Sequence, residues 1–278
     1  MKNWICETCG TQFDAAAAPP AHCPICEDER QYVGWNGQRW TTLEDLRRDH
    51  SNRIEDDAGV IGIGTVPGFA ISQRALLLQT AAGNVLWDCI TLLDDATRAE
   101  VARLGGIDAI AISHPHFYSG MVEWSHAFGG VPIYLHEADR EWVMRRDESI
   151  VHWSGESREI LPGVTLLRLG GHFPGGTVLH WADGADGAGA LFVGDIIAVV
   201  QDRRSVSFMY SFPNLIPLPA AEVQRIAAAV EPYAFERVYG GWWGLNVLQD
   251  AKAAVRRSAD RYQRALERGS AGGAPNRR

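Results

Sequence analysis

Residues 109–116 read Ala109-Ile110-Ala111-Ile112-Ser113-His114-Pro115-His116. The short apolar run at the start is typical of a buried strand, and its end carries His114 and His116. Two histidines at positions i and i+2 of an extended segment project to the same side, so both imidazoles can bind one metal ion. The stretch therefore predicts a core strand that delivers two metal ligands where it runs into a turn.

Two further candidate ligands lie at the ends of other predicted strands. His172 lies in the glycine-rich run 170–176, where glycines permit close approach of the backbone. Asp195 directly follows an apolar run, and no lysine or arginine lies within five residues of it. A buried carboxylate needs a compensating partner, and a metal ion can supply it. His114, His116, His172 and Asp195 are therefore predicted to form one metal site.

Short apolar runs alternate with helix-like stretches from about residue 61 onward. Strands are expected at 75–80, 84–87, 109–113, 132–135, 164–169, 177–181, 190–193 and 237–239. Helices are expected at 94–104, 137–145, 219–230 and 248–267. This order predicts an α/β architecture in which helices cover sheets. Residues 269–278 have too few apolar side chains to bury and are expected to form a disordered tail.

Four of the five cysteines form two Cys-x-x-Cys pairs, Cys6 with Cys9 and Cys23 with Cys26. Four thiolates at this spacing are typical of one tetrahedral ion, which would stabilise a small segment, residues 1–40, that has little core of its own. The segment resembles rubredoxin and zinc-ribbon knuckles. That resemblance implies zinc, with iron as the alternative. The aromatic side chains of Tyr32, Trp35 and Trp40 are expected to pack this segment against the main domain.

Composition and charge indicate which kinds of partner the protein binds and in which compartment it is expected. The chain has 278 residues, a hydrophobic fraction of 46% and a formal net charge of −8, which argues against a surface that binds nucleic acid. No apolar run approaches the roughly 18 residues that a membrane span needs, and the first residues have no signal-peptide pattern. We expect a cytoplasmic protein that binds a small-molecule substrate and neither nucleic acid nor membrane. The sequence leaves homo-oligomerisation open.

The order of the histidines and the aspartate resembles the metallo-β-lactamase superfamily. That family carries H-x-H-x-D-H after a strand, then a G-H-x-x-G histidine, a G-D aspartate and a final histidine. The resemblance covers residues 58–268 and implies a four-layer αββα sandwich, with Asp88 as an early structural aspartate. It also implies that His114, His116 and His172 bind the first metal. Asp195 corresponds to the carboxylate that normally bridges two metals.

The chain departs from the family pattern at the second metal. Tyr118 and Ser119 stand where the family has Asp and His, and Trp242 stands where the final histidine is expected. One zinc ion is therefore expected in this site, beside one in the cysteine knuckle, with iron as the alternative at either. Asp195 would ligate loosely or act as general base, and Tyr118 would stabilise an oxyanion or protonate a leaving group. The alternative for Tyr118 is a space-filling aromatic.

The resulting interpretation is a mononuclear metal hydrolase that acts on an ester, lactone or thioester. The segment 203–218, which contains Arg204 and Phe208 to Tyr210, is expected to form a loop over the site. One alternative is an iron oxidoreductase similar to persulfide dioxygenases, with His114, His172 and Asp195 as the ligands. Another is a non-catalytic binding protein with a degenerate site.

Overall fold

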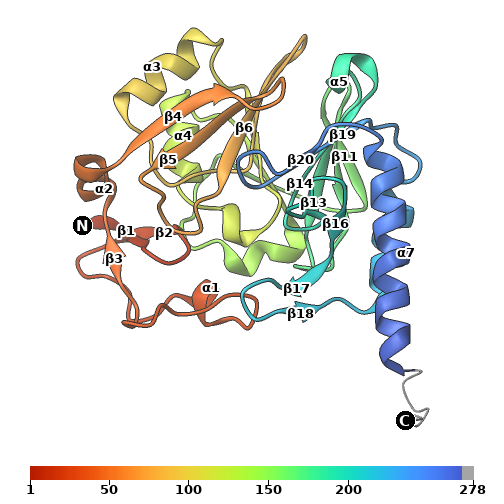
Figure 1. Cartoon of the computed structure of the whole chain (residues 1–278). Helices are drawn as coiled ribbons and strands as arrows, with labels where there is room; N and C mark the ends of the chain where they lie inside the picture. The colour runs from red at the N-terminus through yellow and green to blue at the C-terminus, as the bar shows by residue number, and fades with distance from the viewer. Residues whose placement is uncertain (271–278) are drawn as a thin grey trace.

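The computed structural model describes residues 1–270 and contains two large sheets at the centre of the main domain (Figure 1). The first sheet has the order β10-β9-β8-β7-β6-β5-β4 and the second the order β11-β12-β13-β14-β19-β20. The strands of the first sheet are β4 (Ser51–Asp56), β5 (Ile61–Val66), β6 (Arg74–Thr80), β7 (Gly83–Trp87), β8 (Ala109–Ala111), β9 (Ile133–His136) and β10 (Ile150–Trp153). Those of the second are β11 (Ser157–Leu161), β12 (Val164–Arg168), β13 (Thr177–Trp181), β14 (Ala190–Gly194), β19 (Arg237–Gly240) and β20 (Asn246–Val247).

The two sheets pack face to face because their strands carry apolar residues on both faces. In β6, Leu76 and Leu78 belong to a buried cluster shared with Phe192 and Tyr239 of the second sheet. Leu77, which points to the opposite face, belongs to a different cluster under the helices. The period of two thus assigns alternate residues of one strand to the two faces of its sheet.

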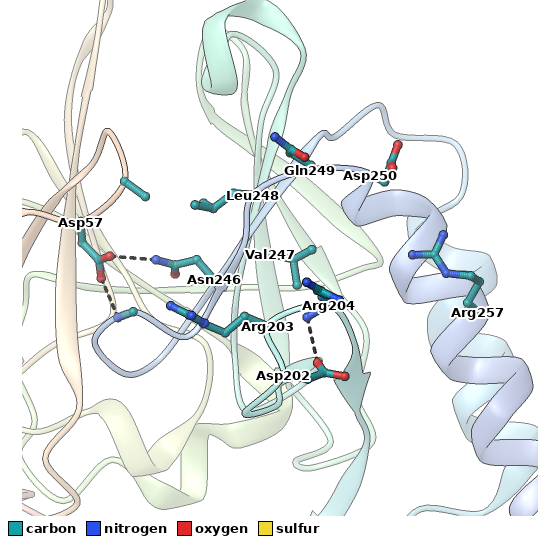
Figure 2. Close-up of a pocket in the computed structure, with 12 residues that line it drawn as sticks. Asp57, Asp202, Arg203, Arg204, Asn246, Val247, Leu248, Gln249, Asp250 and Arg257 are labelled. Carbon is teal, nitrogen blue, oxygen red and sulfur yellow. Dashed lines mark hydrogen bonds between the residues drawn. The ribbon is translucent and has the colours of Figure 1, made fainter.

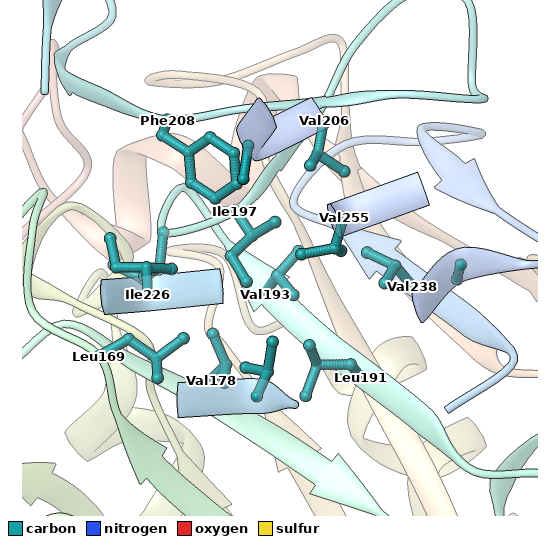
Figure 3. Packing of buried hydrophobic residues seen from close by; sticks show 14 of the residues in the cluster. Leu169, Val178, Leu191, Val193, Ile197, Val206, Phe208, Ile226, Val238 and Val255 are labelled. Carbon is teal, nitrogen blue, oxygen red and sulfur yellow. The ribbon is translucent and has the colours of Figure 1, made fainter. Parts of the chain in front are cut away.

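Helices cover the outer face of each sheet. The helices α3 (Asp95–Arg103) and α4 (Met121–Ala127) pack on the first sheet, and α6 (Ala220–Val230) and α7 (Ala251–Ser270) pack on the second. Figure 3 shows Val178 and Leu191 of the second sheet beneath Ile226 of α6 and Val255 of α7, with Val238 to one side of them. The four layers confirm the predicted αββα sandwich.

The amino-terminal segment forms a small sheet of its own with the order β2-β1-β3. Its elements are β1 (Lys2–Cys6), β2 (Gln12–Ala16), α1 (Pro24–Glu27) and β3 (Trp40–Thr41), followed by α2 (Leu43–Asp49). Trp40 packs edge-on against Phe13, with ring centroids 5.0 Å apart. The prediction was wrong for Trp35, which is 103% exposed, whereas Tyr32 is half-buried.

The remaining elements are short and connect the layers. They comprise η1 (Pro115–Phe117), η2 (Glu137–Trp142), α5 (Gly184–Gly187), the ribbon β15 (Ala198–Val199) with β16 (Val206–Ser207), and the hairpin β17 (Met209–Ser211) with β18 (Ile216–Pro217). The helix expected at 137–145 is only this 3-10 turn, interrupted by a non-helical conformation at Asp139. No helix within residues 1–270 has the length and apolarity needed to cross a bilayer. Of the tail expected at 269–278, residues 271–278 lie outside the described part, and α7 extends to Ser270.

A buried arginine at the start of an interior strand joins the two sheets. Arg74 begins β6 in the first sheet, and its guanidinium donates to the backbone oxygens of Gly240 and Trp242, each at 2.6 Å, and to Asn246 Oδ1 at 2.8 Å. Its Nε lies 2.8 Å from an oxygen of Asp57. Burial lowers the pKa of Arg74 to about 10, so the side chain stays charged at neutral pH.

Replacing Arg74 with Met should therefore destabilise the domain strongly. The substitution removes the cationic partner of the Asp57 carboxylate and the donor to three acceptors in the segment 240–246, at a cost of about 3–5 kcal/mol. Arg98→Met, at an exposed position of α3, is the control and should change the stability by less than about 0.5 kcal/mol. Urea unfolding followed by circular dichroism measures both. Equal midpoints for the two variants would contradict this role of Arg74.

Candidate metal centres

The carboxyl ends of strands from both sheets deliver the four predicted residues to one place. His114 follows β8 and Asp195 follows β14, while His172 lies in the loop between β12 and β13. The three imidazole centroids are 4.8 to 5.1 Å apart. The expectation of a fully extended His-x-His segment was wrong: His114 is extended (φ −170°, ψ 171°), but His116 lies inside the 3-10 turn η1. The turn still directs both rings to the same point.

The donor atoms of this group, here called the histidine site, have the spacing of ligands around one ion. His172 Nε2 lies 3.3 Å from His116 Nδ1, and His114 Nε2 lies 3.6 Å from Asp195 Oδ2. All four ligand atoms lie within 4.8 Å of one another. Two nitrogens bound tetrahedrally to zinc at its usual bond length would be about 3.3 Å apart. The geometry therefore fits a single metal ion.

The burial of these four side chains, with donor and acceptor atoms that lack hydrogen-bond partners, supports the same conclusion. The four residues are between 1% and 5% exposed, and His114 Nε2 and Asp195 Oδ1 have no hydrogen-bond partner. Burial, and then the neighbouring carboxylate of Asp88, raise the pKa of Asp195 to about 8. Burial also lowers the pKa of His114 and His116 well below the usual value, which favours the neutral imidazoles that metals bind. A cation between these groups would satisfy every one of them.

Neighbouring groups hold the ligands in orientation. His172 Nδ1 donates to the backbone oxygen of Met209 at 3.2 Å, which leaves Nε2 as the free lone pair. His114 Nδ1 lies 2.9 Å from Ser113 Oγ, which leaves its Nε2 towards Asp195. Asp88 Oδ1 accepts the backbone N–H of Ser113 at 2.8 Å, and this bond fixes the strand end that carries His114.

Two glycines permit this close packing. Gly194 has φ +49°, and a Cβ at this position would lie 2.4 Å from Ser113 Oγ. A Cβ at Gly175 would lie 2.7 Å from the carboxylate of Asp139, which accepts the Gly175 N–H at 2.7 Å. Larger residues would therefore displace both the strand end before Asp195 and the loop that carries His172.

The residues that stand where ligands of a second metal are expected form hydrogen bonds or pack in the core instead. Ser119 Oγ accepts from Gln73 Nε2 at 2.9 Å, and the indole N–H of Trp242 donates to Ile71 O at 2.9 Å. Tyr118 packs in the core of the first sheet, where burial raises the pKa of its hydroxyl well above the usual value. Within residues 1–270, the histidine site therefore offers ligands for one ion.

The four knuckle cysteines also converge on one point, here called the cysteine site. Cys6 and Cys26 sulfurs are 3.5 Å apart, and those of Cys9 and Cys23 are 3.6 Å apart. All four are buried and unpaired, and two sulfurs bound tetrahedrally to zinc would be about 3.8 Å apart. Gln38 Nε2 donates to Cys6 Sγ at 3.1 Å, which stabilises a thiolate there. Hydrogen bonds among the sulfurs lower the pKa of Cys6 and raise that of Cys9.

Residues 28–31, here called the clasp, connect the two sites and were not anticipated from the sequence. Arg30 donates to Asp28 through Nε and Nη2, at 2.6 and 2.9 Å, and lies 3.9 Å above the ring of Phe173. Its Nη1 donates to the backbone oxygen of His172 at 3.4 Å. Only the closeness of Arg30 to Cys26 in sequence could have suggested this role.

The β17–β18 hairpin holds the clasp from the other side (Figure 1). The Tyr210 hydroxyl donates to Glu29 at 2.7 Å, and Asn214 Nδ2 donates to the backbone oxygens of Glu29 and Gln31 at 2.8 and 3.1 Å. Part of the segment 203–218 therefore lies at the site, as predicted. The expectation was wrong for Phe208, which is fully buried under α7, and for Arg204, which lines a different cavity.

Replacing Arg30 with Ala should loosen the loop that carries His172. Arg30 is 8% exposed, so its loss leaves Asp28 and the His172 carbonyl without their donor, at a cost of about 3 kcal/mol. Arg39→Ala is the matched control, because Arg39 pairs with Glu7 at 3.0 Å on the exposed surface of the same segment and should cost at most about 1 kcal/mol. Hydrogen exchange of residues 170–176 should rise only in Arg30→Ala, and unchanged protection there would contradict the assignment.

Comparison with known proteins places this geometry in a family. The family model for the metallo-beta-lactamase superfamily matches residues 70–264. The uncharacterized protein YmaE of Bacillus subtilis (strain 168) is 52% identical over 269 residues, which are 96% of this chain and 97% of that protein.

Two solved structures share the fold at low sequence identity. A metallo-beta-lactamase of Cronobacter sakazakii with a HARLDQ motif is 19% identical with a TM-score of 0.51, covering 77% of this chain and 92% of that one. The crystal structure of VMB-1 is 13% identical with a TM-score of 0.56, covering 78% and 98%. The chain belongs to the metallo-beta-lactamase superfamily.

Proposed function

We propose that this chain is a metal-dependent hydrolase with one zinc ion in the histidine site and one structural zinc ion in the cysteine site. The observation that carries the proposal is the convergence of four buried donors, two of whose atoms, His114 Nε2 and Asp195 Oδ1, have no other partner. Members of this superfamily are typically metal-dependent hydrolases, which supports the reaction class. The free, buried cysteines support a reducing compartment such as the cytoplasm.

Zinc held by three neutral imidazoles would supply a Lewis acid that lowers the pKa of water to about 7. The residues of the chain would orient the metal ligands and accept the proton. Ser113 and the Met209 carbonyl orient His114 and His172. Asp195 faces His114 with Oδ2, so its unpartnered Oδ1 is the atom that would take the proton from an attacking water.

The substrate would be a small ester, lactone or thioester that enters when the cover of the site moves. The clasp and the β17–β18 hairpin lie over the loop of His172, and the histidines beneath are at most 2% exposed. Opening therefore needs the Tyr210 to Glu29 and Asn214 to Gln31 hydrogen bonds to break. For Tyr118, proton donation and space filling both remain open. Tyr118→Phe distinguishes them, since loss of a donor would lower the rate about 100-fold, whereas loss of a space-filling hydroxyl would leave the rate nearly unchanged.

Elemental analysis should find two zinc ions per chain. Cys23→Ser should remove one, and the double variant His114→Ala, His116→Ala should remove the other, because each change breaks one ligand set. Anomalous scattering with two ions about 3.5–4 Å apart in the histidine site would contradict the single-ion proposal. Iron in that site, with activity that depends on dioxygen, would instead favour the oxidoreductase, and an empty site would favour a non-catalytic protein.

The variant Asp195→Asn should show whether Asp195 takes part in the reaction or only supports the structure. The amide keeps the shape of the side chain but can neither neutralise a cation nor accept a proton, so hydrolysis should fall about 100-fold or more and zinc should bind more weakly. A screen of lactones, thioesters and esters supplies the assay. Asp186→Asn, at an exposed position between β13 and β14, is the control. Full activity and full zinc content in Asp195→Asn would leave Asp195 a structural residue.

A further inference from the structure

A cavity of about 750 Å³ lies outside the histidine site, between the β15–β16 turn, the strand β20 and the start of α7 (Figure 2). Two arginines of the turn, Arg203 and Arg204, and one of the helix, Arg257, contribute guanidinium groups to its wall. Leu248 and Gln249 line it between β20 and α7. Its volume falls within the range of about 300–1,000 Å³ that is typical of small-molecule sites.

Three acidic side chains line this cavity, Asp57, Asp202 and Asp250. Asp57 and Asp202 already have donors, whereas within residues 1–270 no donor reaches the carboxylate of Asp250. Asp57 accepts from the Gly244 N–H at 3.2 Å and from Asn246 Nδ2 at 2.9 Å, as Figure 2 shows. Asp202 accepts the backbone N–H groups of Arg204 and Ser205 at 2.8 and 2.9 Å. These carboxylates are therefore engaged in holding the two turns that carry them.

The guanidinium groups have no such partners. In the part of the chain that the structure describes, Arg203, Arg204 and Arg257 form no ion pair and donate no side-chain hydrogen bond, whereas Arg256, next to Arg257 on α7, pairs with Glu231. Arg203 also has φ +52°, in the left-handed region that costs a non-glycine residue about 1 kcal/mol. The turn thus presents two adjacent cationic side chains at some conformational cost.

The positive surface continues along α7. A second cavity of about 390 Å³ shares Arg204 and Arg257 with the first and adds Arg261 and Arg264, against a single acidic residue, Asp260. Positions 257, 261 and 264 lie on one helix face, where like charges repel one another. An anion bound between them would relieve this repulsion. On a chain with a net charge of −8, this local concentration of five arginines is not a consequence of the overall composition.

We propose that this cavity binds a small molecule that carries a diphosphate or triphosphate group. Arginine forks bind phosphate oxygens in pairs, and three guanidiniums from two elements match a group with several phosphate oxygens. Leu248, which is 44% exposed, supplies an apolar wall for the organic part of the ligand. None of these residues belongs to the histidine site, so a failure of the hydrolase proposal would not affect this one.

Calorimetric titration of the zinc-loaded full chain with ADP, and with adenosine as the uncharged counterpart, tests this site. ADP should bind with micromolar affinity and adenosine at least tenfold more weakly. The double variant Arg203→Gln, Arg204→Gln should weaken ADP binding at least tenfold. The matched control Arg140→Gln, Arg146→Gln removes the same charge from exposed positions around another cavity and should bind ADP as the wild type does.

Three results would overturn the proposal. ADP that fails to bind at millimolar concentration would exclude a site for phosphate-bearing ligands. Equal loss of ADP affinity in both double variants would assign binding to overall charge. Full ADP affinity in Arg203→Gln, Arg204→Gln with loss in His114→Ala, His116→Ala would place the phosphates at the metal centre. Thermal unfolding of each variant confirms that the exposed substitutions leave the fold intact.

Discussion

The main constraint on this structure is that three imidazoles and one carboxylate are buried together at the junction of the two sheets. An isolated buried carboxylate costs several kcal/mol unless a partner compensates it. Within residues 1–270, no arginine or lysine pairs with Asp195; His114 Nε2 lies 3.6 Å from its Oδ2, and burial favours the neutral form of that imidazole. The surrounding structure keeps the group together through Asp88, which fixes Ser113, and through Gly194, which permits the approach of Ser113. A cation at the centre would supply the compensation that the buried carboxylate lacks.

Much of the fold was predictable because its core strands are apolar on both faces. All eight strands expected from the sequence exist, with ends that differ by a few residues. The strand β4, with the sequence Ser-Asn-Arg-Ile-Glu-Asp, was missed because it is a polar edge strand that has no partner beyond β5. The helix α4 was missed because it follows the histidine motif directly, where the sequence indicated only a turn.

The histidine site was predictable to the extent that its residues form a local motif. His114 and His116 are neighbours in sequence, and His172 and Asp195 stand at strand ends that the apolar runs reveal. Arg30 has no such signal, because its contact with His172 joins residues 142 positions apart. Trp35 illustrates the converse error: an aromatic side chain near a metal knuckle was expected to pack, yet its loop leaves it in solvent. Contacts between distant segments depend on the packing of whole elements, which no local pattern contains.

The amino-terminal segment explains how a site with a reduced ligand set stays ordered. Its backbone N–H at Gln12 donates to the Ser119 carbonyl at 3.1 Å, and Thr91 Oγ1 donates to the Gly10 carbonyl at 2.8 Å. Trp142 packs against the cysteine site on one side and Phe173 on the other, with ring centroids 5.7 Å apart.

The segment thus supports the motif turn at Ser119, where the family pattern has a second-metal ligand. Because an ion in the cysteine site would order the residues that lead to Arg30, the two metal centres are expected to be linked energetically through the clasp, although they share no ligand.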